Sequence, residues 1–344
     1  MGWPLEDRPV LIFVSGWISG AGKSTASLGL LGSLLDLGYK PSELAYIKPA
    51  TQCVIDQLVW NFCERHGIAH QGVGPIRYLP GFTQHFLNGK TYTSRELLAR
   101  ARAAVEEIGK GKKVVVVDGV GYPAVGSICG TSNAEVAYAL GAPVLLVGPA
   151  GVGDSLDSFN MMRTFFEAHR VRVLGSVLNK GNAKNMKGMT SGELQAFLNG
   201  AIGRYAPSCC VFGVVPEMSL QDLDLEQRTE TVVRNFAEHV DVAQIVNLAG
   251  DGTAKELGPV ACCALAVAAV VMARRLCTGR DSGVQAGLLG VGVALAGATL
   301  ASHISRARLD RAFTLKVTRT PEVDTPDSAV EAMQEKARTR KTGG

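Results

Sequence analysis

Cysteine pairs with metal-cluster spacing are missing from this chain of 344 residues, and its eight cysteines show no disulfide-framework pattern. We therefore expect no zinc motif and a reducing compartment. A strong excess of one charge is missing as well, because the formal net charge is only +4. Such a mild charge gives no reason to expect nucleic-acid binding. The first residues lack the basic start and apolar core of a secretory signal, so we expect the mature chain to begin near Met1.

The most informative feature that is present is a glycine-rich loop that ends in Gly-Lys-Ser-Thr at residues 22–25. An apolar run precedes the loop and a helical pattern follows it at residues 26–37, which is the strand, loop and helix order that a phosphate-binding loop requires. Glycines let backbone N–H groups converge on phosphate oxygens, and the start of the following helix attracts the same charge. Lys23 is placed to act on the β and γ phosphates as a catalytic residue, and Ser24 to hold Mg²⁺. An ordinary glycine-rich turn would leave the Lys-Ser-Thr sequence unexplained.

The loop is one residue longer than the commonest phosphate loop, because the first glycine is Gly16 rather than position 17, which holds Trp17. We expect a nucleotide to be bound through a set of residues spread along this segment. The set consists of Gly16, Ser19, Gly20, Ala21, Gly22, Lys23, Ser24 and Thr25.

Six short apolar runs alternate with helical patterns along the first two thirds of the chain. They cover residues 10–14, 44–47, 114–117, 144–147, 171–178 and 211–215. This alternation predicts an α/β fold of the P-loop NTPase type, with a mostly parallel sheet and helices on both faces. Ligands bind beyond the carboxyl ends of the strands in such a sheet, and the candidate site residues lie at those ends.

The length of the loop and the strand ends together resemble one enzyme family. Phe13-Val-Ser-Gly, five residues and then Gly-Lys-Ser-Thr-Ala-Ser resemble the opening of dethiobiotin synthetase, an ATP-dependent enzyme related to the ATPase domain of cobyrinic acid a,c-diamide synthases and to the amino-terminal domain of some phosphotransacetylases. Five later strand ends match in order, so the resemblance spans about residues 9–217. They are Tyr46-Ile-Lys-Pro, Val115-Val-Val-Asp-Gly-Val-Gly, Pro143-Val-Leu-Leu-Val-Gly, Leu174-Gly-Ser-Val-Leu-Asn-Lys and Phe212-Gly-Val-Val-Pro-Glu.

Two charged residues gain roles from this resemblance. It implies that Lys48 contacts the substrate and the transferring phosphoryl group as a second catalytic cation, although a surface lysine before a proline is the alternative. Asp118 ends a run of four valines, where a buried carboxylate needs a partner, and Mg²⁺ is the natural one. A turn-capping aspartate is the alternative for Asp118. Asp56 is a weaker candidate for a further metal ligand, with an ordinary aspartate on a helix face as the alternative.

Two residues near later strand ends are candidates for contact with the nucleotide base. The resemblance implies that Asn179 pairs with the edge of adenine and that Pro216 lies against the base. An asparagine can pair as donor and acceptor, but Asn179 also begins a good loop sequence, so a turn role remains open.

The last third of the chain has a different composition. We assign residues 1–250 to the ATP-binding domain, residues 257–302 to an apolar helical hairpin and residues 303–344 to a charged, largely disordered tail. The hairpin has two charge-free runs, 257–273 and 286–302, near the lower length limit for crossing a bilayer. We expect it to associate with a membrane as transmembrane helices, with the ATPase domain in the cytoplasm. The alternative is a soluble hairpin packed on protein.

The combined features favour an Mg-ATP-dependent enzyme that resembles dethiobiotin synthetase. Such an enzyme would phosphorylate a carboxylate or carbamate for C–N bond formation, with a small-molecule acid or amine as its partner. One alternative is an ATP-binding regulatory or scaffolding module without ligase activity. Another is a cobyrinate-type amide ligase, which is weakened because residues after 250 do not resemble a glutaminase. A homodimer is an expectation from the resemblance alone.

Overall fold

The computed structural model describes residues 8–52 and 57–254, and residues 8–52 and 57–250 belong to one compact unit. The strands are β1 (Val10–Gly16), β2 (Leu44–Ile47), β3 (Ala50–Thr51), β4 (Ala69–Gln71), β5 (Ile76–Arg77), β6 (Val114–Asp118), β7 (Val144–Pro149), β8 (Val173–Gly181) and β9 (Cys210–Pro216). The α-helices are α1 (Lys23–Asp36), α2 (Leu58–His66), α3 (Phe82–Leu87), α4 (Ser94–Ile108), α5 (Asn133–Leu140), α6 (Gly153–Ala168), α7 (Ser191–Ile202), α8 (Leu225–His239) and α9 (Val242–Ala254). Short 3-10 helices cover Pro41–Glu43 and Ser127–Cys129.

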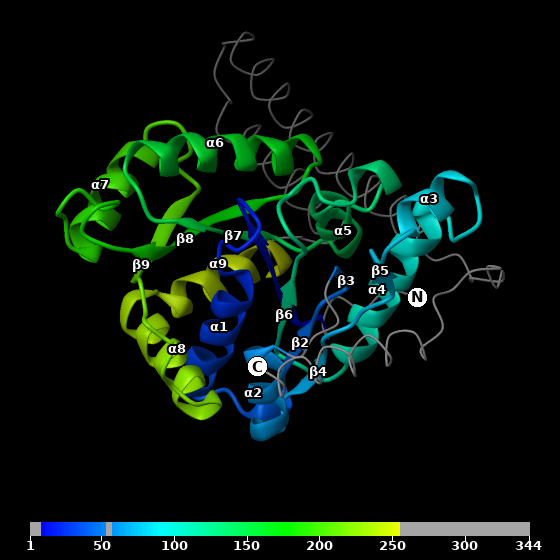
Figure 1. Cartoon of the computed structure of the whole chain (residues 1–344), viewed down its shortest axis with the longest axis horizontal. Helices are drawn as coiled ribbons and strands as arrows, with labels where there is room; N and C mark the ends of the chain where they lie inside the picture. Colours follow the sequence, from blue (N-terminus) through cyan, green and yellow to red (C-terminus); the bar gives the residue numbers. More distant parts are fainter. Residues whose placement is uncertain (1–7, 53–56, 255–344) are drawn as a thin grey trace, which may run out of the picture. The chain divides into compact units, whose positions relative to one another are not determined.

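Seven strands form one sheet in the order β4-β2-β6-β1-β7-β8-β9, and every neighbouring pair is parallel. The central strands β1, β6 and β7 are almost wholly buried, as the valine-rich sequences of parallel strands require. A second, two-stranded sheet pairs β3 with β5 beyond the end of β2. Because the strands are parallel, the carboxyl ends of β1, β2 and β6 lie at the same end of the strands (Figure 1).

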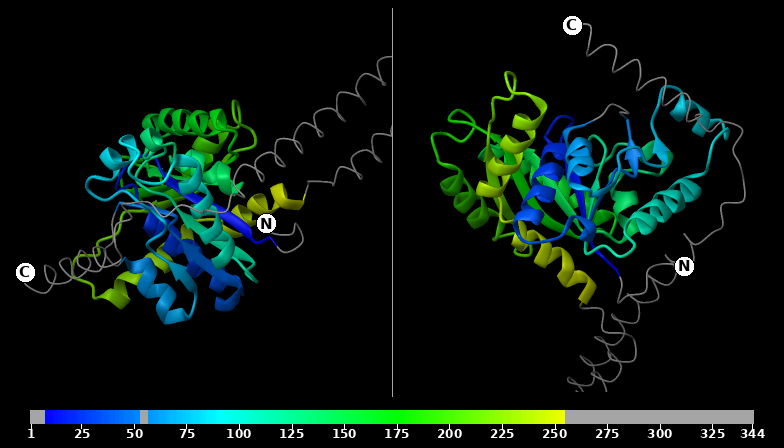
Figure 2. Two further views of the ribbon diagram at one scale, coloured as in Figure 1. Left: turned by 90° about the vertical axis from the view of Figure 1, so that its right-hand side faces the viewer. Right: turned by 90° about the horizontal axis from the view of Figure 1, so that it is seen from below.

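Helices cover both faces of the large sheet (Figures 1 and 2). One layer holds α1, α2, α8 and α9, whose apolar residues share a core with alternate residues of the strands. The other layer contains α4, α5, α6 and α7, which contact the sheet from the opposite side or one another. This arrangement confirms the predicted P-loop NTPase-like α/β fold with a mostly parallel sheet.

All six predicted strands are present, and the seventh strand of the sheet is the one that the sequence did not indicate. That strand, β4, has only three residues, and each is half-buried at the edge of the sheet. Two of the three are polar, His70 and Gln71, so no apolar run marks the strand. The helix expected at residues 26–37 begins three residues earlier, at Lys23, directly after the glycines.

The apolar hairpin expected at residues 257–302 and the tail expected at 303–344 lie outside the described residues. Within residues 8–52 and 57–254, no helix combines the length and the apolar character that a membrane crossing needs. The expected membrane association therefore stays a prediction.

Two glycines allow α8 to approach α1 closely. A Cβ atom on Gly29 would lie 2.2 Å from Cγ of Phe236, and one on Gly32 would lie 2.4 Å from a methyl group of Val233. Phe236 is buried in the same core as the sheet residues under α1. The glycines of α1 thus set the spacing between α8 and the helix that follows the phosphate loop.

We predict that Gly29→Ala destabilises the fold, because overpacking a tight contact costs about 1 to 3 kcal/mol and outweighs the gain in helix propensity. Gly200 in α7 is the matched control, since a Cβ there meets nothing within 4 Å. Gly200→Ala should raise the free energy of unfolding by about 0.5 to 1 kcal/mol. Denaturant titration measures both, and equal stability of the two variants would contradict this account of helix packing.

Candidate functional site

The glycine-rich segment joins β1 to α1 at the carboxyl edge of the sheet. Gly20 and Gly22 adopt positive φ angles of 78° and 98°, which side-chain-bearing residues rarely adopt. Gly22 is the N-cap of α1, and no side chain caps this helix start. The first N–H groups of a helix have no partner within the helix, so those of α1 are available to an anion. The loop therefore has the backbone of a phosphate site.

Lys23 lies in the first turn of α1, and its side chain folds back over β1. A Cβ on Gly16 would lie 3.0 Å from Cγ of Lys23, so a glycine at position 16 keeps the path of the lysine open. The pKa of the Lys23 ammonium is lowered, mainly by burial and further by the charge of Lys48, while Asp118 opposes the shift. A partly desolvated cation of this kind favours an anionic ligand, because added negative charge would offset the cost of burial.

Asp118 is the centre of the site, and three side chains meet one of its oxygens. Oδ2 of Asp118 accepts hydrogen bonds from Oγ of Ser24 at 3.0 Å and from the hydroxyl of Tyr46 at 2.9 Å. Nζ of Lys48 lies 3.4 Å from the same oxygen. Asp118 and Tyr46 are fully buried, and Lys48 is 6% exposed. The structure thus brings the predicted residues Ser24, Lys48 and Asp118 together.

The other carboxylate oxygen of Asp118 is left open. Oδ1 is buried and has no hydrogen-bond partner within residues 8–52 and 57–254. A buried carboxylate oxygen without a hydrogen-bond partner lowers the stability of the fold. A cation, or a water molecule bound to a cation, would supply the missing partner. With the Ser24 hydroxyl beside it, this hard oxygen set fits the Mg²⁺ expected from the sequence. Asp56, the further candidate ligand, lies outside the described residues.

Tyr46 is a member of the site that sequence analysis did not single out. It lies two residues before Lys48, and Asp118 lies two residues after Val116, the strand partner of Tyr46. Because side chains alternate along a strand, these positions share the face covered by α1. The pKa of Tyr46 is raised well above its usual value, first by burial and then by the Asp118 charge. The phenol therefore stays protonated and donates to the carboxylate.

Asn179 and Lys180 contact the phosphate loop from the end of β8. Nδ2 of Asn179 donates to the carbonyl of Ala21 at 3.1 Å, and Nζ of Lys180 donates to the carbonyl of Gly20 at 3.0 Å. A Cβ on Gly22 would lie only 2.1 Å from that amide nitrogen, so the asparagine packs directly on the loop. The structure gives Asn179 a role in supporting the loop, and its predicted contact with adenine stays a prediction.

Asn133 fixes the loop that follows Asp118, and it too was not identified from the sequence. Its side chain is buried, accepts from the backbone N–H of Val120 and donates to the carbonyls of Val120 and Tyr122. The amide nitrogen also reaches Oγ of Ser15 on β1 at 3.4 Å. One amide group therefore connects the loop after β6 to the strand that leads into the phosphate loop.

Trp17, the bulkiest residue of the phosphate loop, packs against Gly148 on β7, the strand beside β1 in the sheet. Trp17 is 3% exposed, and a Cβ on Gly148 would lie 2.1 Å from its indole ring. The backbone N–H of Trp17 donates to the carbonyl of Val147, which holds the start of the loop on β7. The unusual residue at position 17 is thus an anchor of the loop, while Ile18 is exposed beyond it.

The remaining predicted residues lie at the same edge of the sheet. Ser19 is exposed in the loop, and Thr25 is half-buried in the first turn of α1. Pro216 ends β9, three strands from β1, and its carbonyl accepts a hydrogen bond from Asn235. No group of three or more His, Cys, Asp or Glu residues within the described ranges is arranged to hold a metal by itself.

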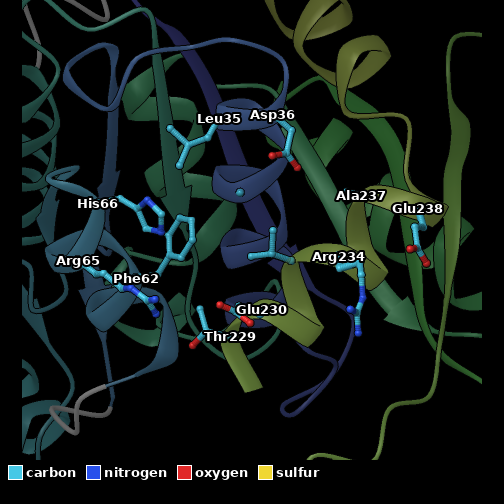
Figure 3. Close-up of a pocket in the computed structure, with 12 residues that line it drawn as sticks. Leu35, Asp36, Phe62, Arg65, His66, Thr229, Glu230, Arg234, Ala237 and Glu238 are labelled. Atoms are coloured by element: carbon cyan, nitrogen blue, oxygen red, sulfur yellow. The ribbon is translucent and has the colours of Figure 1, made fainter. Parts of the chain in front are cut away.

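A separate pocket of about 670 Å³ lies between α1, α2 and α8 (Figure 3). It is lined by the last turns of α1, including Asp36, and by Phe62, Arg65 and Arg234. Asp36 lies thirteen residues after Lys23 on α1, so the rise of 1.5 Å per residue separates the two by roughly 20 Å along the helix axis. Charged groups of both signs surround this pocket, and it shares no lining residue with the phosphate loop.

Several solved structures of other proteins have a similar fold. Similar solved structures include the MinD cell division protein of Aquifex aeolicus, at 14% identity and a TM-score of 0.41, covering 72% of this chain and 98% of that one. A putative plasmid partition protein of Borrelia burgdorferi B31 bound to AMPPNP is also similar, at 14% identity and a TM-score of 0.41, covering 70% and 98%. These values are low, so no substrate or partner is transferred from either protein. No curated protein matches the chain significantly.

The sequence itself matches one protein family over most of the region just described. The family is AAA_26, described as an AAA domain, and the match covers residues 11–222, which include the phosphate loop, Lys48, Asp118, Asn179 and Pro216. Because the match covers more than half of the chain, this protein belongs to the AAA_26 family of AAA domains and is a nucleotide-binding P-loop protein.

Proposed function

We propose that this protein uses Mg-ATP to phosphorylate the carboxylate or carbamate of a small molecule, which prepares it for C–N bond formation. The observation that carries the proposal is the buried Lys48 ammonium, 3.4 Å from the Asp118 carboxylate. Nucleotide binding alone needs only the loop and Lys23. A second, almost wholly buried cation is suited to charge that develops when a phosphoryl group is transferred.

The residues divide into two groups by position. Lys23 and the N–H groups at the start of α1 belong to the loop and would bind the phosphates whatever reaction follows. Lys48 follows β2, which β6 separates from β1, so it approaches from outside the loop and can stabilise a group that leaves the nucleotide. Ser24 and Oδ1 of Asp118 would hold Mg²⁺, which when bound neutralises charge on the transferring phosphate.

The proposed reaction balances in two steps. A substrate carboxylate oxygen attacks the γ-phosphorus of ATP, so that one P–O bond forms, the bond to ADP breaks and a mixed anhydride results. An amine then attacks the acyl carbon, phosphate leaves and the amine loses one proton. The buried Lys48 beside Asp118 supports this reaction, which the resemblance to dethiobiotin synthetase implies, over a purely regulatory module.

The proposed tether to a membrane rests on the sequence of residues 257–302 alone. Carbonate extraction of membranes that contain the full chain tests it directly. Retention in the pellet supports integral insertion, and release into the supernatant would end that part of the proposal.

We predict that Lys23→Met and Lys48→Met have different effects. Lys23→Met should abolish measurable ATP binding in calorimetry, because it removes the cation on the phosphate loop. Lys48→Met should keep ATP binding within about tenfold but lower ATP turnover by about 10² to 10³, because its charge acts on the transferring group. Turnover is measured with bicarbonate and a panel of amino acids or dicarboxylic acids.

Lys110→Met is the matched control, since Lys110 is an exposed lysine before β6, at the opposite edge of the sheet, where it pairs with Glu107. It removes the same charge and should leave binding and turnover unchanged. If the wild-type protein binds Mg-ATP tightly but no acid or amine stimulates turnover, the ligase reaction is wrong and the regulatory alternative gains support.

A further prediction concerns Asn179, whose amide nitrogen already donates to the loop carbonyl of Ala21. We expect Asn179→Ala to weaken binding of ATP and GTP by a similar factor, about fivefold to tenfold, which corresponds to one lost hydrogen bond of about 1 to 1.5 kcal/mol. Competition binding with both nucleotides measures the two factors. A loss confined to ATP would contradict the loop-supporting role and favour recognition of adenine.

A further inference from the structure

Tyr46 lies at the centre of β2 with no exposure to solvent, yet it carries a polar group. Leu44 and Tyr46 on β2 and Val116 on β6 belong to the apolar core beneath α1 and α2. The hydroxyl reaches out of this core to Oδ2 of Asp118 at 2.9 Å. A phenylalanine would fill the same space, so the apolar core alone gives no reason for the oxygen atom.

The three donors to Oδ2 of Asp118 differ in what else they must do. Under the proposed function, Ser24 is a ligand of the metal and Lys48 acts on the transferring phosphate. Tyr46 has neither task, because its ring is enclosed in the core and only its hydroxyl reaches the site. Of the three side chains, Tyr46 alone can keep its hydrogen bond to Oδ2 when the nucleotide engages the other two.

A tyrosine is well suited to hold this carboxylate without neutralising it. The phenol is uncharged, and its rigid ring is fixed by the buried neighbours on β2 and β6. Oδ1 of Asp118 stays buried and unpaired while all three donors meet Oδ2. The hydrogen bond from Tyr46 therefore fixes which carboxylate oxygen is presented to a cation.

We propose that Tyr46 is a positioning residue that orients Asp118 for Mg²⁺, so that the hydroxyl of Tyr46 sets the metal affinity of the nucleotide complex. This inference rests on the proposed Mg-ATP site and goes beyond it, because the residue acts through Asp118 and touches neither nucleotide nor metal. Groups that orient a metal ligand typically change metal affinity by about 10-fold to 100-fold when they are removed.

The test is the Mg²⁺ dependence of nucleotide binding by Tyr46→Phe in the full chain. The readout is the concentration of Mg²⁺ that gives half-maximal binding of a fluorescent ATP analogue, so no turnover is required. We expect this concentration to rise about tenfold or more. Binding of the analogue without metal should stay within about twofold of the wild type. An unchanged Mg²⁺ requirement would overturn the proposal.

Tyr78→Phe is the matched control for loss of a tyrosine hydroxyl. The hydroxyl of Tyr78 also makes hydrogen bonds, to the carbonyl and Oγ1 of Thr131, but it does not contact Asp118. Tyr78→Phe should lose stability and keep the Mg²⁺ requirement of the wild type. If both variants raise that requirement equally, the effect is a general consequence of lost stability and the positioning role is wrong.

A double-mutant comparison shows whether Tyr46 acts through Asp118. In an Asp118→Asn background, Tyr46→Phe should have no further effect on the Mg²⁺ requirement, whereas independent effects would multiply and contradict the proposal. If Tyr46→Phe does not fold, crystals of the wild type with Mg²⁺ and an ATP analogue decide. A Tyr46 hydroxyl still bonded to Asp118 supports the proposal, and a displaced one contradicts it. Absence of Mg-ATP binding by the wild type would instead refute the proposed function.

Discussion

The site depends on one buried carboxylate at the end of a central strand. Burial of the Asp118 charge is unfavourable unless donors or cations compensate for it. Ser24, Tyr46 and Lys48 all supply that compensation to a single oxygen; Ser24 lies at the start of α1, and Tyr46 and Lys48 lie on β2 and directly after it. The second oxygen remains buried without a partner. The hydrogen bond from Ser24 links the start of α1 to β6, and those from Tyr46 and Lys48 link β6 to the end of β2. Oδ1 remains available to a cation.

Much of the fold and part of the site follow from the sequence, because a parallel sheet has a simple signature. Strands buried on both faces are apolar throughout, so the four valines of β6 and the runs of β1 and β7 are visible without any structure. A charged residue at the end of such a run then falls at the binding edge. Asp118 was found in this way, whereas the role of Lys48 came from the resemblance to dethiobiotin synthetase, and the structure places the two side chains together.

The rest of the site depends on contacts between distant segments, which a single sequence does not reveal. Asn133 starts an ordinary capped helix, and only the fold brings its amide to the loop after β6. Lys180 binds the carbonyl of Gly20 across 160 positions of the chain. For Tyr46 a signal existed, since its two-residue spacing from Lys48 puts both on one face of the strand. An aromatic residue within an apolar run fits core packing equally well, so the spacing alone does not single out Tyr46.

The central claim is that Asp118 and the phosphate loop together form a metal-nucleotide site. Crystals grown with Mn²⁺ and a non-hydrolysable ATP analogue test this claim most directly, because manganese is located by its anomalous scattering. The account predicts a manganese peak beside Oδ1 of Asp118 and Oγ of Ser24, with the analogue's phosphates on the start of α1. A bound analogue whose metal lies away from Asp118, or a loop without nucleotide, would contradict it.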